Sequence, residues 1–350
     1  MKVSIYDVAN LAGVSISTVS RVLNKSGYVS SKTEKKVYDA VEKLNFTPNI
    51  MAQNLANNET KLIGLYFPSL LDSKWSISNT YILEFINGVN EVLIQHGYHL
   101  LLINEMNGRE QIMADECKPQ YYSFLKQKRI DGLILGANPV DCSSFFELLN
   151  LKMPVVYIGE KRFNNAGLNV YAQYKQYNKD ILEYFYQRNH QHVAVISSEK
   201  NLMESIIREF KMDQNDDNLK VELFSYSGNL DSYLETLRTI FTQNEKPTGL
   251  LVQDIAKVQQ TINYLNNLQL KVPDDVSLIT VEHNFQAGEQ FFPAVTSVYV
   301  PAYQMAVEAT KLLFDYLQGN QNFTKEVIVN SNIIERHSVK TILNELVKRK

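Results

Sequence analysis

Residues 13–27, "GVSISTVSRVLNKSG", carry side chains well suited to contact another molecule. If a helix begins near Ser15 and turns by about 100° per residue, it has two distinct faces. A solvent-facing surface is usually rich in Lys, Glu and Gln, whereas short hydroxyls, an amide and one arginine suit close contact with a polar surface. One face is a predicted buried stripe of Val19, Val22 and Leu23. The opposite face carries Ile16, Ser17, Ser20, Arg21 and Asn24.

Three short helices are predicted over the first 45 residues, and they position this polar face. The first helix ends at Gly13, and Ser15 is the expected N-cap of the second. The third begins at "SKTE", where Ser31 and Glu34 have the spacing of a capping box. The core faces of the first and third helices are Ile5, Val8, Ala9 and Ala12, and then Val37, Ala40, Val41 and Leu44. Two short helices joined by a glycine-containing turn, with a third packed across them, form a helix-turn-helix.

Charge is distributed unevenly between the two ends of the chain. Residues 1–58 contain seven Lys or Arg and four Asp or Glu, which gives +3, whereas the whole chain carries −3. The remainder is therefore −6. A small basic module joined to a larger acidic body is typical of a nucleic-acid-binding protein with a second function.

Length and composition predict a soluble protein of two or three domains. The chain has 350 residues, of which 45% are hydrophobic, enough for substantial cores. Cys117 and Cys142 are expected to remain reduced thiols. The first residues lack the apolar run of a secretory signal, and no segment approaches the roughly 18 apolar residues of a membrane span. The predicted location is the cytoplasm.

From Leu62 onward, short apolar runs alternate with longer amphipathic segments. The runs lack polar alternation, which predicts strands of parallel sheets covered on both faces by helices. A span of about 280 residues is large for one such sheet, so two doubly wound subdomains with a cleft between them are expected. Ligands of such folds bind beyond the carboxyl ends of the strands. The predicted strands are "LIGLYF", "HLLLI", "DGLILG", "PVVYIG", "HVAVIS", "GLLVQ" and "VSLITV".

A conditional helix is predicted in the connection "NFTPNIMAQNLANNETK", residues 45–61. Met51, Ala52, Leu55 and Ala56 make a short apolar strip, but only about eight residues are available, and isolated helices below about 12–15 residues are marginal in water. This segment should be helical only when a partner holds it, which makes it a candidate switch.

The stretch "SIYDVANLAGVSISTVSRVLNKSGYVSSKTEKKVYDAVEKLNFTPNIMAQNLA" closely resembles the DNA-binding headpiece and hinge of the lactose/galactose repressor family. The remainder is similar to the family's periplasmic-binding-protein-like core, with "YILEFINGVNEVLIQHGYHLLL", "RIDGLILG", "KVPDDVSLITV" and "PAVTSVYVPAYQMAVEATKLL" in order. The resemblance implies a headpiece at 1–45, a hinge at 46–60, a core at 61–340 and a short tail at 341–350. Within the core it implies an N-subdomain of about 61–160 plus 288–319 and a C-subdomain of about 161–287 plus 320–340.

The resemblance also assigns DNA contacts to individual residues. Ile16, Ser17 and Arg21 are expected to contact base edges in the major groove, where Arg21 can pair bidentately with guanine and Ile16 can contact a thymine methyl. Leu55 matches the family's minor-groove wedge, with packing against its own protein as the alternative. Contacts with the phosphate backbone, which fix register, are expected from Tyr6, Ser15, Ser20, Asn24, Tyr28, Ser30 and Thr33.

The family assembles on near-palindromic operators, so a homodimer is expected. Some relatives tetramerise through a heptad helix at the C-terminus. Here "TILNELVKRK" supplies at most one heptad, fewer than the three or four of a coiled coil, which favours a dimer.

Four core residues match the family's effector-contacting positions: Tyr81, Arg208, Gln253 and Glu282. A guanidinium, a carboxylate and an amide suit the hydroxyls of a sugar or sugar derivative, the expected effector by family frequency. The alternatives are a surface ion pair for Arg208 and a solvated loop carboxylate for Glu282. The chain departs from the family pattern at Gly159, Ala172, Gln173, Lys211 and Ser227.

The expected function is that of a ligand-gated transcription repressor, without a cofactor or a metal. The alternative is a solute-binding protein of a transport system, although the headpiece argues against it. An enzyme is disfavoured because no glycine-rich phosphate loop, nucleophile elbow or metal-type cluster is present. The "HQH" at 190–192 is expected to form a polar turn between a helix and a strand. An effector must bind the two core states unequally if it is to change hinge spacing and DNA affinity.

Overall fold

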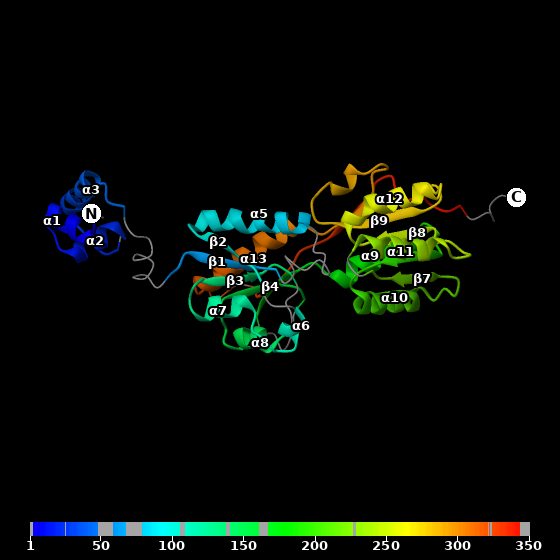
Figure 1. The fold of residues 1–350 in the computed structure, drawn as a ribbon, viewed down its shortest axis with the longest axis horizontal. Coiled ribbons are helices and arrows are strands. Elements are labelled where there is room, and N and C mark those ends of the chain that lie inside the picture. The colour runs from blue at the N-terminus through cyan, green and yellow to red at the C-terminus, as the bar shows by residue number, and fades with distance from the viewer. Residues whose placement is uncertain are drawn as a thin grey trace. The chain divides into compact units, whose positions relative to one another are not determined.

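The computed structural model describes residues 3–24, 26–47, 59–67, 79–105, 109–137, 141–160, 167–226, 229–320, 322 and 324–343. The chain divides into two compact units, Met1–Lys61 and Leu62–Lys350. We call the first the headpiece and the second the core, and describe each by itself (Figure 1).

The headpiece contains the three predicted helices: α1 (Ile5–Ala12), α2 (Ile16–Leu23) and α3 (Ser31–Lys43). Gly13 ends α1 in the left-handed conformation (φ 64°), which a residue without a Cβ adopts easily. α1 packs against both α2 and α3. The shared core consists of Val8, Ala9, Ala12, Val19, Val22, Val37 and Ala40. The predicted helix-turn-helix is therefore confirmed as a structural unit.

Helix capping agrees with the prediction at α2 and differs from it at α3. Ser15 caps α2 by accepting a hydrogen bond from the Thr18 amide (3.2 Å). The N-cap of α3 is Ser30, not the expected Ser31, because Ser30 has extended backbone dihedrals and accepts from the Thr33 amide (3.4 Å). Ser31 is already the first helical residue, so the capping box expected there was wrong.

One six-stranded sheet forms what we call the first lobe of the core. All its neighbouring strands are parallel, in the order β11-β5-β4-β3-β1-β2. Its strands are β1 (Leu62–Tyr66), β2 (His99–Ile103), β3 (Gly132–Leu135), β4 (Val155–Ile158), β5 (Leu168–Tyr171) and β11 (Glu326–Ile328). Its helices are α5 (Asn79–His96), α6 (Arg109–Met113), α7 (Gln120–Lys126), α8 (Ser143–Asn150) and α13 (Ala302–Leu317).

Helices cover both faces of this sheet, which explains why its strands lack polar alternation (Figure 1). Ile63 and Leu65 of β1 belong to the same apolar cluster as α5 and α13, whereas Tyr66 packs with α7 and α8. α5 and α13 also pack directly on each other. Adjacent side chains on a strand point to opposite faces, so both sets are buried.

A second six-stranded sheet forms the second lobe, in the order β12-β10-β9-β8-β6-β7. Its pairs are parallel except β10 with β12, which is antiparallel. Its strands are β6 (His192–Ile196), β7 (Lys220–Phe224), β8 (Gly249–Val252), β9 (Ser277–Glu282), β10 (Thr296–Tyr299) and β12 (Asn332–Ile334). Its helices are α9 (Tyr174–Tyr186), α10 (Lys200–Gln214), α11 (Leu230–Phe241) and α12 (Val258–Asn267), with the 3-10 turns η1 (Ile255–Lys257) and η2 (Ala287–Gln290).

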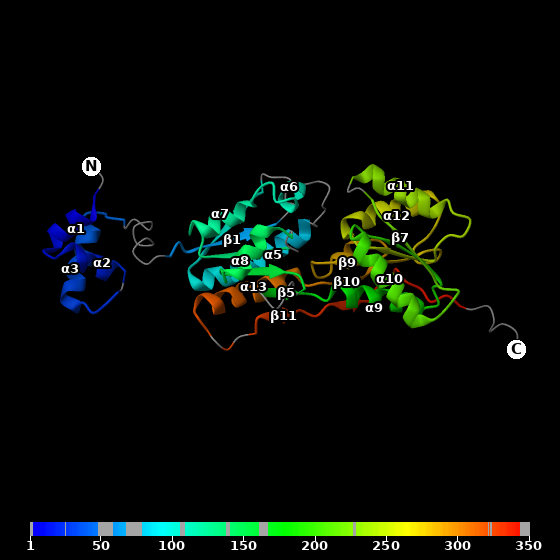
Figure 2. The same cartoon turned by 90° about the horizontal axis from the view of Figure 1, so that it is seen from below.

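The layering of the first lobe is repeated in the second, seen from a different side in Figure 2. Val193 and Val195 of β6 pack with α9 and α10, and Ala194 and Ile196 pack with α11 and α12. Two doubly wound subdomains are therefore confirmed. No helix among the described ranges is long and apolar enough to cross a membrane.

The chain passes between the lobes three times: between β5 and α9, between β10 and α13, and between β11 and β12. The expected subdomain boundaries were wrong at each passage. Strands 168–171 and 326–328 pair in the first sheet, and strand 296–299 pairs in the second. These strands have only three or four residues, and their sheet is decided by the strand with which each one pairs, at sequence separations from 12 to 157 residues.

Candidate nucleic-acid interface and effector site

The predicted DNA-contacting face of α2 is exposed in the headpiece. Val19 and Val22 are buried in the headpiece core, so the opposite side of the helix faces outward. Ile16 is 39% exposed, and Ser17 and Arg21 are also exposed. The structure therefore brings these three side chains onto one accessible face.

Arg21 has its charged group available for an external partner. Among the described residues, no carboxylate lies within 4.0 Å of its guanidinium, and the side chain is exposed. A Cβ added at Gly27 would lie 3.9 Å from Cδ of Arg21, so the aliphatic part of the arginine runs past this turn. A planar, always charged group without an internal partner is suited to bidentate pairing with guanine or phosphate.

Hydroxyl groups gather at the first turns of α2 and α3. Ser15 Oγ lies 2.8 Å from both Ser17 Oγ and Thr18 Oγ1 at the start of α2. Ser30 Oγ lies 2.9 Å from Thr33 Oγ1 at the start of α3. Helix N-termini carry free amides and a partial positive charge, so these hydroxyls lie where a phosphate would be favoured.

The remaining predicted backbone contacts are also on the headpiece surface. Tyr6 on α1 is 63% exposed, and Tyr28, between α2 and α3, is 94% exposed. Asn24 donates from Nδ2 to Ser20 Oγ (3.2 Å), so these two already contact each other. Leu55 and most of the predicted hinge, residues 48–58, lie outside the described residues.

In the core, Tyr81 lies where the two lobes touch. Its side chain is buried, its hydroxyl donates to the Gly136 carbonyl after β3 (2.8 Å), and burial raises its pKa. Its ring meets the His283 ring edge-on, with 5.0 Å between centroids. One turn further along α5, Glu84 accepts a hydrogen bond from Asn284 (3.0 Å). We call these four residues, Tyr81, Glu84, His283 and Asn284, the lobe contact.

Gln253 follows β8 and is held by polar neighbours of its own lobe. Its Nε2 donates to Asn178 Oδ1 (2.7 Å), and its amide lies within hydrogen-bond distance of the Tyr174 hydroxyl (2.9 Å from Nε2). Tyr174 and Asn178 belong to the first turns of α9, directly after a passage between the lobes. Burial raises the pKa of Tyr174, so its hydroxyl remains protonated and can donate. The sequence-based prediction did not include Tyr174 or Asn178.

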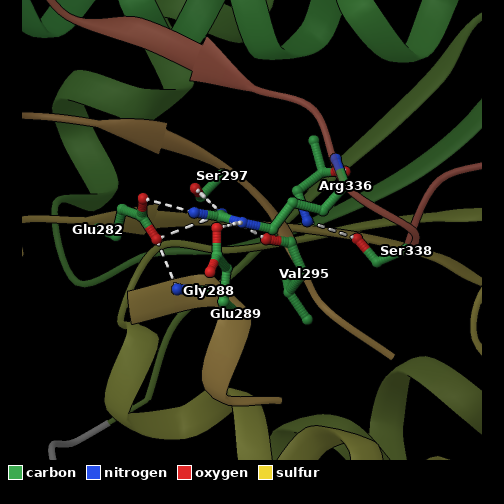
Figure 3. Close-up of polar contacts among 8 residues, drawn as sticks. Glu282, Gly288, Glu289, Val295, Ser297, Arg336 and Ser338 are labelled. Atoms are coloured by element: carbon green, nitrogen blue, oxygen red, sulfur yellow. Dashed lines mark hydrogen bonds and ion pairs between the residues drawn. The ribbon is translucent and has the colours of Figure 1, made fainter. Parts of the chain in front are cut away.

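Glu282 is fully buried at the end of β9, and its carboxylate is bound within the second lobe (Figure 3). Oε1 accepts from Arg336 Nη2 (3.0 Å), and Oε2 accepts from the Gly288 amide (2.6 Å). The same guanidinium donates to the Val295 carbonyl (2.8 Å) and to Ser297 Oγ (2.7 Å). This geometry does not support Glu282 as an effector ligand, nor is it a solvated loop carboxylate.

Arg336 was missed in the sequence because its partner lies 54 positions away. No local pattern in the sequence around Arg336 points to this pairing. Only the pairing of β9 with β10, and of β10 with β12, brings Arg336 to that carboxylate.

Within the described part of the chain, Arg208 forms no hydrogen bond or ion pair with Tyr81, Gln253 or Glu282. It lies on the exposed side of α10, eight residues after the helix begins, which is about 12 Å along the helix axis. There it lines an open groove beside the edge strand β7. No ion pair joins it to any described residue, so the surface-ion-pair alternative is not formed either.

The described part of the chain contains no group of three or more His, Cys, Asp or Glu side chains that could hold a metal ion. Cys117 is partly buried and Cys142 is buried, and both are free thiols. The buried His190 lies between the Thr248 hydroxyl and the Lys340 carbonyl, 3.0 Å from each. The "HQH" motif connects α9 to β6 as predicted, but it follows the turn at 187–189, and His192 is already the first residue of β6, with its Nε2 2.7 Å from Glu222 Oε2.

Three family descriptions match successive parts of the chain. "Bacterial regulatory proteins, lacI family" matches residues 4–49. "Periplasmic binding proteins and sugar binding domain of LacI family" matches residues 63–210, and "Periplasmic binding protein-like domain" matches residues 182–339.

Curated relatives align with nearly the whole chain. It is 28% identical to the HTH-type transcriptional repressor PurR of Histophilus somni (strain 2336), covering 97% of this chain and 99% of the relative. It is 29% identical to the HTH-type transcriptional regulator RegA of Clostridium saccharobutylicum, with the same coverage. Identity to catabolite control protein A of Priestia megaterium is 27%, over 91% of this chain and 93% of that protein.

Solved structures share the fold. A lac repressor dimer bound to operator and the anti-inducer ONPF superposes with a TM-score of 0.78 at 20% identity, covering 97% of this chain and 100% of that one. The complex of the transcriptional regulator CelR with cellobiose superposes with a TM-score of 0.64, also at 20% identity, covering 96% of this chain and 99% of that one. With the helix-turn-helix headpiece and the two-lobed core already described, these matches show that the chain belongs to the LacI family of bacterial regulatory proteins.

Proposed function

We propose that this protein is a sequence-specific DNA-binding transcriptional repressor controlled by a small-molecule effector. The observation that carries the proposal is the accessible face of α2, where Ile16, Ser17 and Arg21 point outward and Arg21 has no carboxylate partner among the described residues. The relatives named as transcriptional repressors support the same role. Action on chromosomal operators would take place in the cytoplasm.

At the operator, α2 enters the major groove and the hydroxyls at the starts of α2 and α3 contact phosphates. Arg21 pairs with guanine O6 and N7, and Ile16 contacts a thymine methyl. Ser15, Ser30 and their neighbours fix the register through the backbone without selecting the sequence. A homodimer places two headpieces on a near-palindromic site, and Leu55 of each hinge acts as a minor-groove wedge.

The effector site in this proposal is the region between the carboxyl ends of the two sheets. Tyr81 and His283 mark it from the two lobes, and Gln253 with Tyr174 and Asn178 offers amide and hydroxyl groups suited to sugar hydroxyls. Glu282 is neutralised by Arg336, and Arg208 lies at the edge strand. Without that arginine in the site, an uncharged carbohydrate is favoured over a sugar phosphate.

Effector binding would change operator affinity by linkage. The effector must bind one arrangement of the lobes more tightly than the other. Tyr81 and His283 already touch, so a ligand bound near them alters the contact between the lobes. The change in lobe placement would then alter the spacing of the two hinges in the dimer, and with it Leu55 insertion.

Replacement of Arg21 tests the DNA-binding part of the proposal. An operator is first selected from a pool of randomised duplexes with the full-length protein. Arg21→Ala should lose roughly 1–3 kcal/mol of specific binding and relax preference at one base pair in each half-site. The measurement is a fluorescence-anisotropy titration with the selected operator and single-base-pair variants.

The matched control is Lys36→Ala, which removes one positive charge from the exposed surface of α3. It should weaken binding to all duplexes about equally, because a charge that acts only through the phosphate field carries no sequence information. Unchanged base preference in Arg21→Ala would contradict the assignment of this residue.

The effector part is tested by a thermal-shift screen of neutral sugars and sugar phosphates, followed by operator titrations with each compound that stabilises the core. We expect the compounds that stabilise the core to be neutral sugars rather than sugar phosphates. A compound that stabilises the core without changing operator affinity would contradict the coupling.

A further inference from the structure

The groove beside β7 is a surface that the DNA-binding proposal does not use. It lies between α10 and the edge strand β7 and has a volume of about 600 Å³. Its apolar lining includes Ile207, Leu219, Val221 and Leu223, and the exposed Met212 lies at its rim. A second groove of about 320 Å³ shares the lining residue Asp216 with it.

Strand β7 has a free edge along this groove. Within the described part of the chain it is the last strand of its sheet and pairs with β6 alone. The Lys220 amide donates to Gln191, and the Phe224 carbonyl accepts from Ser197, so these residues turn their backbone groups toward β6. Backbone groups alternate in direction along a strand, and therefore Val221 and Leu223 direct their N–H and C=O groups toward the free edge. Such an edge is a template for an added strand.

The last described residues lead toward this edge. The segment crosses the amino ends of the second sheet in strand order: the Ser338 carbonyl accepts from Leu278 of β9 (2.8 Å), and the Lys340 carbonyl lies 3.0 Å from Nε2 of His190, just before β6. The Ile342 carbonyl accepts from Asn189 Nδ2 (2.8 Å). The next strand in this direction is β7, and Asn189 itself lines the smaller groove.

The charges of the two grooves complement the residues that follow. The lining has four acidic side chains, Glu183, Glu204, Asp216 and Asp217, against two basic ones, Arg208 and Lys211. Residues 344–350 read Asn-Glu-Leu-Val-Lys-Arg-Lys, with two apolar side chains followed by three basic ones. Seven extended residues span about 23 Å, which is longer than the five-residue edge strand β7.

We propose that the groove between α10 and the free edge of β7 binds residues 344–350 of the same chain as an added strand. Leu346 and Val347 supply the apolar contact, and the basic residues that follow meet the acidic lining. The bound segment covers the edge of the second sheet, which would otherwise be open to strand pairing with other molecules. This inference does not depend on DNA or effector binding.

Hydrogen–deuterium exchange of the Val221 and Leu223 amides tests the proposal. The full-length protein is compared with a chain ending at Leu343, and truncation should speed exchange at these two amides by about tenfold or more, since they lose their hydrogen-bond partners. Exchange at buried β8 amides reports whether the lobe remains folded. Equal exchange at Val221 and Leu223 in both proteins would overturn the proposal.

Full-length variants with altered charge show whether the basic residues themselves, and not only the presence of the segment, are needed for binding. The triple variant K348E/R349E/K350E should resemble the truncated chain, whereas the matched K348R/R349K/K350R should resemble the native protein. Asp217→Lys should also speed exchange, and combining it with the triple reversal should restore part of the protection. Native-like exchange in the triple reversal would contradict the charge argument.

Protein concentration identifies which chain supplies the strand. An intramolecular strand protects Val221 and Leu223 equally in dilute and concentrated samples. Protection that increases with concentration would overturn the proposal in favour of a strand from a second copy.

Discussion

Glu282 was predicted to bind the effector, but its ion pair with Arg336 gives it a structural role. Both side chains are almost fully buried, 0% and 5% exposed. Removing two charges from water is costly, and the cost is met only when each group has good partners. Here the carboxylate accepts from Arg336 and the Gly288 amide, and the guanidinium also reaches Ser297. The pair thereby ties β9 and β10 to the segment that follows β12.

Glu282→Gln should strongly destabilise the core, because it leaves the Arg336 charge buried without its counter-ion. The expected loss is roughly 3–5 kcal/mol of unfolding free energy, measured by urea denaturation followed by circular dichroism. Glu235→Gln, which removes an exposed partner of Arg238, serves as the matched control and should leave the midpoint almost unchanged. A small effect of Glu282→Gln would show that the pair is not a main support of the lobe.

At the scale of elements, the close packing of α5 on α13 holds the first lobe together. A Cβ added at Gly88 would lie 2.4 Å from the Tyr303 carbonyl oxygen and 2.9 Å from Ala306 Cβ. Neither distance is possible without movement of a helix backbone. The glycine in "FINGVNE" is therefore required by the approach of α13, whose sequence lies more than 200 residues away.

Gly88→Ala should lower the stability of the core although alanine favours helices. Overpacking of this kind costs typically about 1–3 kcal/mol, and part of it should appear as a lower thermal midpoint. Asn90→Ala, on the exposed side of the same helix, should change stability by less than about 0.5 kcal/mol. If Gly88→Ala were neutral or stabilising, α5 and α13 would not be as closely packed as described.

At the scale of the whole molecule, the lobe contact joins the two halves of the core. Tyr81 and Glu84 come from the start of α5, and His283 and Asn284 follow β9. Burial lowers the pKa of His283, whose Nδ1 lies 3.3 Å from the Val300 carbonyl, and Asp254 opposes this effect in part. Protonation of His283 would place a positive charge between the lobes.

Core stability should therefore fall on acidification. The folded-state pKa of His283 lies below its unfolded value of about 6.5, so its contribution is complete above that value and is lost as the pH falls below it. The urea midpoint should decrease between pH 7.5 and pH 5.5, and His283→Asn should make the decrease smaller. His190, whose pKa burial also lowers, retains part of the dependence. His99→Asn, at an exposed histidine, is the control. If it reduced the pH dependence of the urea midpoint as much as His283→Asn does, the assignment to His283 would be contradicted.

The headpiece and the general architecture of the core could be predicted from the residues alone. Helix periodicity, Gly13 and Ser15 act within a few residues of one another, so three helices and the outward face with Arg21 could be predicted from local spacing. Apolar runs such as "LIGLYF" and "GLLVQ" likewise indicated buried parallel strands.

Which groups meet across the core depends on strand pairing and packing that local patterns do not reveal. Strand 296–299 joins the second sheet because its backbone pairs with β9, and no local pattern distinguishes that choice. Glu282 looked like a ligand group until Arg336, 54 residues later, satisfied it. The guanidinium of Arg208 is suited to binding an effector, but the residue lies in the second half of α10, beside the free edge of β7. Sheet pairing and burial are non-local interactions, and for this reason the architecture could be predicted from residue types while the composition of the effector site could not.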